Sequence, residues 1–248
     1  SQRKLKNIEK LYGDTMSESI LSGKYYCGSC LVGCGRVIEI KKGKYKTNGN
    51  IGGPEYETLG MLGSNLLINN LEAVSKFNEL CNRYGMDTIS TGSVLGMIME
   101  CYDRGLVNRE FLDGVDMSWG NENAVISMIH KIGKREGVGE LLGEGTRKIS
   151  EEIGSYASEF AIHTKGLEAP AHDPRARSGL ALGYATSNRG ACHLQAFAYD
   201  IEGEDVQTVP DMGYPESLDR FEAKGKPIFI IKFQNLMSMF DSVICCKF

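Results

Sequence analysis

Three cysteines lie close together near the start of the chain, in the run Cys27-Gly-Ser-Cys30-Leu-Val-Gly-Cys34. Thiolates are soft ligands, and three of them on one short glycine-rich loop can face the same metal without large backbone strain. Because three ligands leave a position open, the pattern requires a fourth partner elsewhere in the chain. The spacing favours a [4Fe–4S] cluster held by four thiolates. Structural zinc and a redox thiol pair remain alternatives at this point.

The fourth thiolate has five candidates, which are Cys81, Cys101, Cys192, Cys245 and Cys246. Cys81 and Cys101 occupy apolar positions of expected helices, where a cysteine behaves as a small hydrophobic residue. The pair Cys245-Cys246 follows a long expected helix and can lie in a loop. Adjacent residues point in different directions, so at most one member of this pair is expected to bind a metal.

Composition limits the class of protein. The chain has 248 residues, of which 42% are hydrophobic and 24% are charged, as in a globular protein with a sizeable core. A net charge of −4 without a basic stripe argues against a nucleic-acid partner, and no apolar run has the roughly 20 residues of a membrane helix. Eight cysteines without a visible signal peptide indicate a reducing cytoplasm. Neither end looks complete, so we interpret the chain as a segment of a longer protein.

Apolar residues at helical spacing dominate the chain. They predict helices over residues 5–21, 59–84, 91–102, 124–135, 141–153 and 227–243. Residues 36–41 alternate like a strand, turn at Lys42-Gly43 and return through 44–46, which predicts a small hairpin after the cysteine loop. Residues 166–215 show little periodicity. We therefore expect a mainly α fold with two domains, residues 1–162 and 163–248.

Three further residues could carry chemistry. Glu57 follows a Gly-Pro turn, and in isolation it is typical of an acidic residue at a helix start. His172 and His193 each lie beside turn-forming residues, and two such loops in one glycine-rich region indicate a shared site. His130 and His163 fall in an expected helix and strand, and we interpret both as structural.

Several short motifs occur in a fixed order and are more specific together than singly. They are the cysteine loop, Gly53-Pro-Glu-Tyr-Glu-Thr58, Asn82-Arg-Tyr-Gly-Met-Asp87, Lys165-Gly-Leu-Glu168, His172-Asp-Pro-Arg175, Thr186-Ser-Asn-Arg-Gly-Ala-Cys-His193 and Asp241-Ser-Val-Ile-Cys-Cys246-Lys-Phe. This series closely resembles the aldehyde ferredoxin oxidoreductase family of tungsten or molybdenum enzymes. The resemblance spans most of the chain and implies the multihelical second and third domains of that family, the third only in part.

Members of that family hold a bis-pterin tungsten or molybdenum centre beside a [4Fe–4S] cluster. They oxidise aldehydes to carboxylic acids and pass electrons to ferredoxin. The resemblance implies that the cluster ligands are Cys27, Cys30, Cys34 and Cys246. Cys246 is preferred over Cys245 because it is the sixth residue of the family's Asp-x-x-Gly-Leu-Cys pattern.

The resemblance also implies contacts to the two pterins. Asp241 begins the pattern that ends in the cysteine, and the related pattern Asp-x-x-Gly-Leu-Asp matches Asn82 through Asp87. Asn82 replaces the usual Asp, so a charge-assisted bond to the pterin would become a weaker neutral bond. Ile244-Cys245 replaces the usual Gly-Leu, and Ile does not easily adopt the positive φ that Gly allows. We therefore expect this turn to be altered.

By the same resemblance, Glu57 would lie near the metal as a base for water or for the aldehyde hydrate. His193 would face it as a proton donor or a polariser of the carbonyl oxygen, and His172 would lie near the substrate. The family's N-terminal pterin-binding domain is absent from this segment, so we expect the isolated segment to be inactive.

Three functions are compatible with these residues. The first is a fragment of a tungsten or molybdenum oxidoreductase that uses a small aldehyde and ferredoxin. The second is a family member that reduces an aromatic acyl-CoA thioester. The third is a non-catalytic iron–sulfur module for electron transfer. Relatives can dimerise through a metal bridge, so a homodimer is a further expectation, with neither a nucleic-acid nor a membrane partner.

Overall fold

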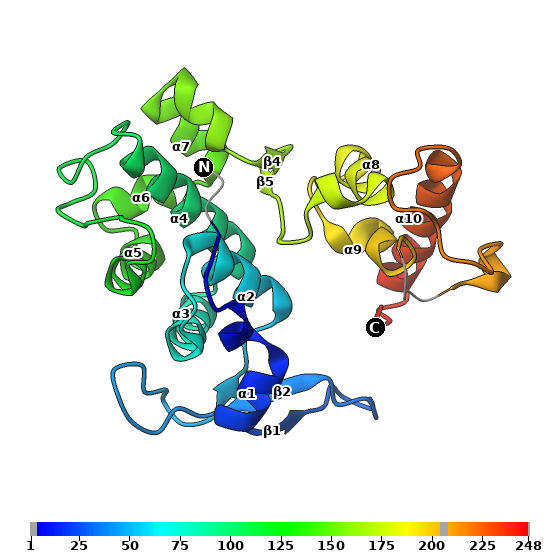
Figure 1. The fold of residues 1–248 in the computed structure, drawn as a ribbon, viewed down its shortest axis with the longest axis horizontal. Coiled ribbons are helices and arrows are strands. Elements are labelled where there is room, and N and C mark those ends of the chain that lie inside the picture. Colours follow the sequence, from blue (N-terminus) through cyan, green and yellow to red (C-terminus); the bar gives the residue numbers. More distant parts are fainter. Residues whose placement is uncertain (1–3, 204–207, 248) are drawn as a thin grey trace. The chain divides into compact units, whose positions relative to one another are not determined.

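The structure is a computed structural model that describes residues 4–203 and 208–247. It divides into two compact units, Ser1–Ala161 and Ile162–Phe248 (Figure 1). Helices dominate both units, which confirms the expected mainly α fold class. Within the described ranges, no helix has the length and apolar character needed to cross a membrane.

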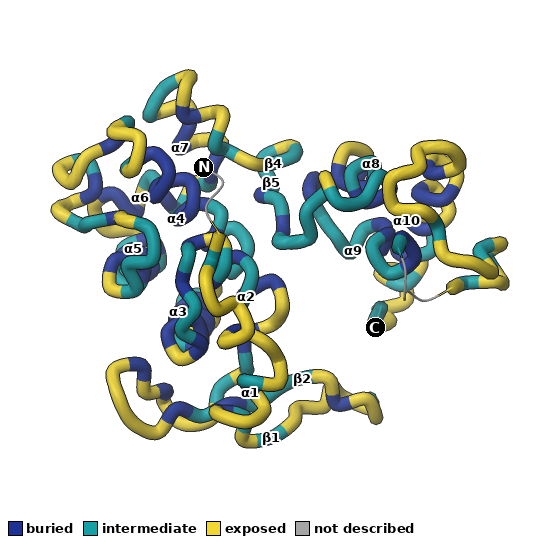
Figure 2. Tube along the Cα trace, in the orientation of Figure 1, coloured by how far each residue is buried: buried dark blue, intermediate teal, exposed yellow. Residues whose placement is uncertain are grey.

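The first unit is built around one buried helix. Its helices are α1 (Gly13–Ser19), α2 (Tyr56–Leu62), α3 (Leu71–Tyr84), α4 (Thr88–Asp103), α5 (Glu122–Lys134), α6 (Val138–Leu142) and α7 (Thr146–Ile153). Helix α4 contacts α2, α3, α5 and α7. Residues such as Leu95, Ile98 and Cys101 on α4 are fully buried. The tube of α4 is accordingly dark blue over most of its length (Figure 2). A helix that is apolar on all sides is expected at the centre of a core, and α4 takes that position.

Capping residues set the ends of the longer helices. The side chains of Asn70, Asp87 and Asn121 accept hydrogen bonds from the backbone N–H groups three residues later, and so begin α3, α4 and α5. Gly85 ends α3 as its C-cap, in the left-handed conformation with φ of 68°.

A small antiparallel sheet contains the cysteine loop. Its strands are β1 (Leu21–Tyr25), β2 (Gly35–Ile38) and β3 (Ile51–Gly52), in the order β1-β2-β3. The helix expected over 5–21 is therefore wrong at its end, because Leu21 pairs with Ile38 in the sheet. Upstream, the helical stretch is also interrupted at Tyr12, whose backbone is extended.

The hairpin expected after the cysteine loop has a different partner. Strand β2 pairs with β3 at residues 51–52, whereas residues 44–46 form no strand. Tyr45 and Thr47 are instead drawn into the core. The Thr47 hydroxyl accepts a hydrogen bond from Ile40 N at 3.0 Å, and Tyr45 donates to Glu122. These tertiary contacts override the local turn at Lys42-Gly43.

Two expected helices are broken by glycines. The helix predicted over 59–84 divides into α2 and α3, with a 3₁₀ turn at Ser64–Leu66 between them. A Cβ atom on Gly63 would lie 2.4 Å from the carbonyl oxygen of Leu59, so this close approach requires glycine. The helix predicted over 141–153 divides into α6 and α7 around Gly143 and Gly145.

The second unit packs two helices against α10. It contains the short strands β4 (His163–Thr164) and β5 (Leu167–Glu168), and the helices α8 (Ser178–Thr186), α9 (His193–Ala196) and α10 (Lys226–Ser242). Helix α10 agrees closely with the helix expected over 227–243 and contacts both α8 and α9. Helix α8 was not predicted, because its sequence is apolar on every side and therefore has no helical period.

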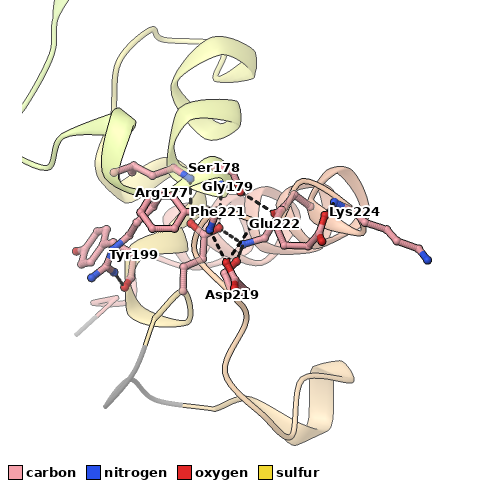
Figure 3. A network of polar contacts seen from close by, with 11 residues as sticks. Arg177, Ser178, Gly179, Tyr199, Asp219, Phe221, Glu222 and Lys224 are labelled. Atoms are coloured by element: carbon pink, nitrogen blue, oxygen red, sulfur yellow. Dashed lines mark hydrogen bonds and ion pairs between the residues drawn. The ribbon is translucent and has the colours of Figure 1, made fainter.

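Polar contacts fasten the start of α8 to the chain that leads into α10 (Figure 3). Ser178 N donates to the carbonyl oxygen of Arg220 at 2.7 Å, and the Ser178 hydroxyl donates to that of Glu222 at 2.8 Å. The Asp219 carboxylate accepts hydrogen bonds from the backbone N–H groups of Phe221 and Glu222. The first turn of α8 is thereby held against this segment.

A buried ion pair lies beneath the same helix end. The fully buried Glu202 carboxylate accepts hydrogen bonds from Gly179 N at 2.8 Å and Leu180 N at 3.1 Å, and it pairs with Lys226. Lys226 is also buried and donates to the carbonyl oxygen of Asp219 at 2.7 Å. A carboxylate at a helix N-terminus satisfies amide groups that have no partner within the helix.

Candidate functional site

The three-cysteine run forms the loop of the β1–β2 hairpin. Tyr25 and Gly35 form the pair that closes the loop, so Cys27 follows the end of β1 by two residues and Cys34 directly precedes β2. Cys27 and Cys34 are exposed and Cys30 is half-buried. Cys30 N donates to the carbonyl oxygen of Cys27 at 3.0 Å, which forms a tight turn. The hairpin thus brings three accessible thiols into one loop.

The thiols of the loop are not gathered as closely as a single ion requires. Among the residues that the structure describes, the sulfur atoms of Cys27, Cys30 and Cys34 do not all lie within 4.8 Å of one another. Sulfurs around one tetrahedral zinc ion, with bonds of about 2.3 Å, lie within about 4 Å of one another. The three sulfur atoms are therefore not gathered around a single ion, and it is the chemistry of three accessible soft thiolates that fits a metal–sulfur group.

Cys81 and Cys101 belong to the core of the first unit, as predicted. Both are fully buried, on α3 and α4. Burial raises the pKa of the Cys81 thiol to about 12 and that of Cys101 to about 11. Thiols with such pKa values stay protonated near neutral pH and are poor metal ligands.

Cys246 lies in an exposed turn that follows α10. Ile244 in this turn has φ of 56°, Ile244 N donates to the carbonyl oxygen of Asp241, and Cys245 N donates to that of Phe240. Ile244 is 94% exposed. The alteration expected from Ile at a glycine position is therefore not seen, because the side chain points into open space and the turn keeps its left-handed residue.

The related pattern at the end of α3 forms the same turn. Gly85 has φ of 68°, Gly85 N donates to the carbonyl oxygen of Asn82, and Met86 N donates to that of Cys81. Both patterns thus end a helix with the same pair of hydrogen bonds, which is a Schellman motif. One turn leads to Asp87 and the other, at the equivalent position, leads to Cys246.

The three residues expected to contact pterins are all exposed at these helix ends. Asn82 lies in the last turn of α3, and the Asp87 carboxylate accepts a hydrogen bond from Ser90 N at 2.7 Å as the N-cap of α4. Asp241 lies in the last turn of α10 and forms an ion pair with Lys247, with oxygen-to-nitrogen distances of 2.8 and 2.9 Å.

Glu57 lies in the first turn of α2 and is 8% exposed. Two polar contacts surround this helix start: Arg36 pairs with Glu55, and the hydroxyl groups of Thr58 and Thr88 lie 2.9 Å apart. The expected place of Glu57 at a helix start is therefore observed, and its carboxyl group is buried rather than solvated.

His172 and His193 lie together within the second unit. Their rings stack with centroids 4.9 Å apart and an interplanar angle of 10°. The shared location expected from their two loops is therefore observed. His193 is not in a turn, however, because it is the first residue of α9. The Tyr184 hydroxyl donates to the backbone carbonyl of His172 at 2.9 Å and fixes that loop.

Tyr199 is a member of this group that the sequence did not indicate. Its ring centroid lies 4.3 Å from that of His172 and 5.9 Å from that of His193. The backbone carbonyl of Tyr199 accepts a hydrogen bond from Arg177. Burial raises the pKa of the neighbouring Asp200 carboxyl, while the charges of His172 and Arg177 act in the opposite direction. A single tyrosine among apolar residues carries no signal of its own, so only the fold identifies it.

The curated relatives that the chain matches are oxidoreductases, which defines the class of protein. Tungsten-containing aldehyde ferredoxin oxidoreductases of Pyrococcus furiosus and Thermococcus kodakarensis are 38% and 37% identical over 238 residues, which is 95% of this chain. An aliphatic sulfonate oxidoreductase, WOR-like subunit, of Pyrococcus furiosus is 31% identical over 256 residues, which is 97% of this chain and 40% of the relative.

The family follows from a match over the whole chain. The family model for aldehyde ferredoxin oxidoreductase, domains 2 & 3, matches residues 1–248, and the chain belongs to this family. The chain spans 37% of the length of the two aldehyde ferredoxin oxidoreductases. The solved active site complex BamBC of benzoyl coenzyme A reductase, in complex with 1,5-dienoyl-CoA, has a TM-score of 0.70 over 94% of this chain and 38% of that chain. At 18% identity, this likeness shows the fold alone.

Proposed function

We propose that this chain is the part of a tungsten or molybdenum pterin oxidoreductase that carries its [4Fe–4S] cluster and its acid–base residues, and that the whole protein oxidises small aldehydes to carboxylic acids. One observation carries the proposal most directly. The same turn follows α3 and α10, and it presents a carboxylate, Asp87, in one case and a thiol, Cys246, in the other. The same type of helix-ending turn would thus place one contact to a pterin of the metal centre and one ligand for the [4Fe–4S] cluster.

The cluster would be held by Cys27, Cys30, Cys34 and Cys246. Three of these thiols share one hairpin loop, where Cys27 and Cys34 are exposed. Such a cluster would carry electrons one at a time to a ferredoxin. Cys245, the neighbour of Cys246, would point away from the cluster.

The pterin groups would be held by Asn82, Asp87 and Asp241. These side chains are polar and exposed at two helix ends, which suits groups rich in hydrogen-bond donors. The tungsten or molybdenum centre would supply the two-electron chemistry that protein side chains lack. Lys247 would hold the Asp241 carboxylate in one orientation through its ion pair.

The acid–base residues would be Glu57, His172 and His193. Glu57 would accept a proton from water or from the aldehyde hydrate, and its burial would keep bulk solvent away from this carboxyl group. His193 would donate a proton or a hydrogen bond to the substrate oxygen. His172 would orient the ring of His193 through the stacked contact.

The organisation of the whole protein is part of the proposal. Residues 1–162 and 163–248 would be its second domain and part of its third, with a pterin-binding domain supplied by the rest of the protein. The protein would act in the cytoplasm, with ferredoxin as its electron acceptor and with a homodimer as its assembly.

Anaerobic reconstitution of the chain with iron and sulfide tests the cluster. We expect about four iron atoms per chain, with loss of the cluster in Cys246→Ser and retention in Cys245→Ser. Uptake of zinc in preference to iron, or equal behaviour of the two variants, would contradict the ligand assignment.

Turnover tests the reaction. The full-length protein should reduce an artificial acceptor with small aldehydes, while the isolated chain should show no turnover. A full-length protein that instead acts on an aliphatic sulfonate or reduces an aromatic acyl-CoA would exclude the aldehyde as substrate. A full-length protein that acts on none of these would favour an electron-transfer module.

A further inference from the structure

Two consecutive tyrosines, Tyr25 and Tyr26, come directly before the first cysteine of the loop and cover two glycines near its end. A Cβ atom on Gly33 would lie 2.2 Å from Cε1 of the Tyr26 ring. A Cβ atom on Gly35 would lie 2.9 Å from Cβ and Cδ1 of Tyr25. Real Cβ atoms do not approach other atoms so closely, so each tyrosine packs where only glycine leaves room.

These two glycines flank Cys34. Gly33 is buried although it lies in an otherwise exposed loop, and it has φ of 61°. Gly35 is the first residue of β2 and pairs with Tyr25. The tyrosines are 60% and 54% exposed, so one side of each side chain faces the loop while the rest faces outward.

The contacts link the two ends of the loop. Tyr26 is adjacent to Cys27, and its ring lies on the residue before Cys34. Fixing the ring therefore fixes the backbone that leads into the first thiol and into the last thiol at the same time. Cys30, half-buried at the middle of the loop, forms a turn with Cys27 through its backbone N–H.

We propose that Tyr26, supported by Tyr25, is a positioning residue that fixes the backbone beside Cys27 and Cys34 before a metal group binds; the link to a [4Fe–4S] cluster rests on the function proposed above. Ordering a loop in advance lowers the conformational entropy that binding must otherwise overcome. The aromatic ring, rather than the hydroxyl group, makes the contact with Gly33. Phenylalanine should therefore replace Tyr26, whereas alanine should not.

The test compares Tyr26→Ala, Tyr26→Phe and Gly33→Ala in the full chain. Tyr12→Ala is the matched control, because Tyr12 is also 54% exposed but lies outside the loop. After reconstitution with iron and sulfide, each chain is exposed to a chelator, and cluster loss is followed by visible absorbance. We expect loss at least about tenfold faster in Tyr26→Ala and Gly33→Ala, which corresponds to about 1.4 kcal/mol. Tyr26→Phe and Tyr12→Ala should match the unaltered chain.

A second readout needs no cluster. Diamide takes two hydrogen atoms from a pair of thiols, so that one S–S bond forms as the diazene becomes a hydrazine, and the Cys27–Cys34 product is measured by mass spectrometry. We expect this disulfide to form several-fold more slowly in Tyr26→Ala than in Tyr12→Ala, with unchanged thermal transitions for both variants. A merely structural role would change the transition instead.

The two readouts separate the two proposals. If the unaltered chain takes up no iron, the proposed function fails, and the disulfide rate alone decides the role of Tyr26. If Tyr26→Ala retains its cluster and forms the disulfide as fast as Tyr12→Ala, the positioning role is refuted.

Discussion

Replacing Lys226 with Met is the sharpest test of how the second unit is stabilised. The side chain of Lys226 is 4% exposed and that of its partner Glu202 is fully buried. The same carboxylate also accepts the first amide groups of α8, from Gly179 and Leu180. Lys226→Met keeps a side chain of similar length but leaves this carboxylate buried without its cation.

The expected cost follows from that burial. Removing one partner of a buried ion pair typically costs about 3–5 kcal/mol, because the other charge remains uncompensated. The two amide hydrogen bonds still stabilise Glu202, so we expect a value near the lower limit of about 3 kcal/mol. Lys148→Met is the matched control, since Lys148 pairs with Glu151 at 2.8 Å with both side chains more than half exposed. Such a surface pair contributes about 0–1 kcal/mol.

Hydrogen exchange measured by mass spectrometry reads the effect locally. A loss of about 3 kcal/mol should speed exchange in α8 and α10 by more than about 100-fold. Urea unfolding followed by the fluorescence of Trp119, the single tryptophan of the chain, reports on the first unit, which does not contain Lys226. If Lys226→Met and Lys148→Met accelerate exchange equally, the ion pair does not stabilise the second unit and the reasoning fails.

Three further predictions concern single residues. Iodoacetamide at pH 8 should leave Cys81 and Cys101 unmodified in the folded chain, because burial raises their pKa values to about 12 and about 11. The contribution of these neutral thiols to stability is complete below the ordinary thiol pKa of about 8.5. The free energy of unfolding should therefore fall as the pH rises from about 8.5 toward 12. Gly85→Ala should destabilise the first unit by about 1 kcal/mol in urea unfolding, because φ is 68°; the cost stays small because no atom lies within 4 Å of the added Cβ. Ile244→Gly should slow hydrogen exchange at the end of α10, because it removes the same backbone strain. The opposite sign for either variant would contradict the equivalence of the two turns. Tyr199→Leu should shift the ring proton resonances of the two stacked histidines and Tyr199→Phe should largely preserve them, while unchanged shifts in both would show that the ring does not order the pair.

Much of the architecture could be predicted from local patterns. Helices α10 and α5 depend on the spacing of apolar residues a few positions apart, and the structure places both close to the predicted ranges. The burial of Cys81 and Cys101 follows from the same spacing. The motif series also indicated the family to which the chain belongs.

The predictions failed where distant contacts outweigh local preference. The return strand lies at 51–52 rather than 44–46, because Tyr45 bonds to Glu122 on α5. Helix α8 had no period to detect, since it is apolar on every side. Ile244 adopts a conformation that its side chain disfavours, because the end of α10 requires it and solvent leaves room for it.

The cysteine loop depends both on its local sequence and on the tertiary structure around it. Its three thiols, its glycines and its preceding tyrosines are all visible in the printed chain. That Tyr26 lies on Gly33, and that Tyr25 pairs with Gly35, depends on strands β1 and β2 folding back on each other. Spacing along a chain determines which chemistry is available, because ligand types and turns are local properties. Contacts between residues far apart in sequence determine how that chemistry is held, since they form only when the packing of the whole unit does.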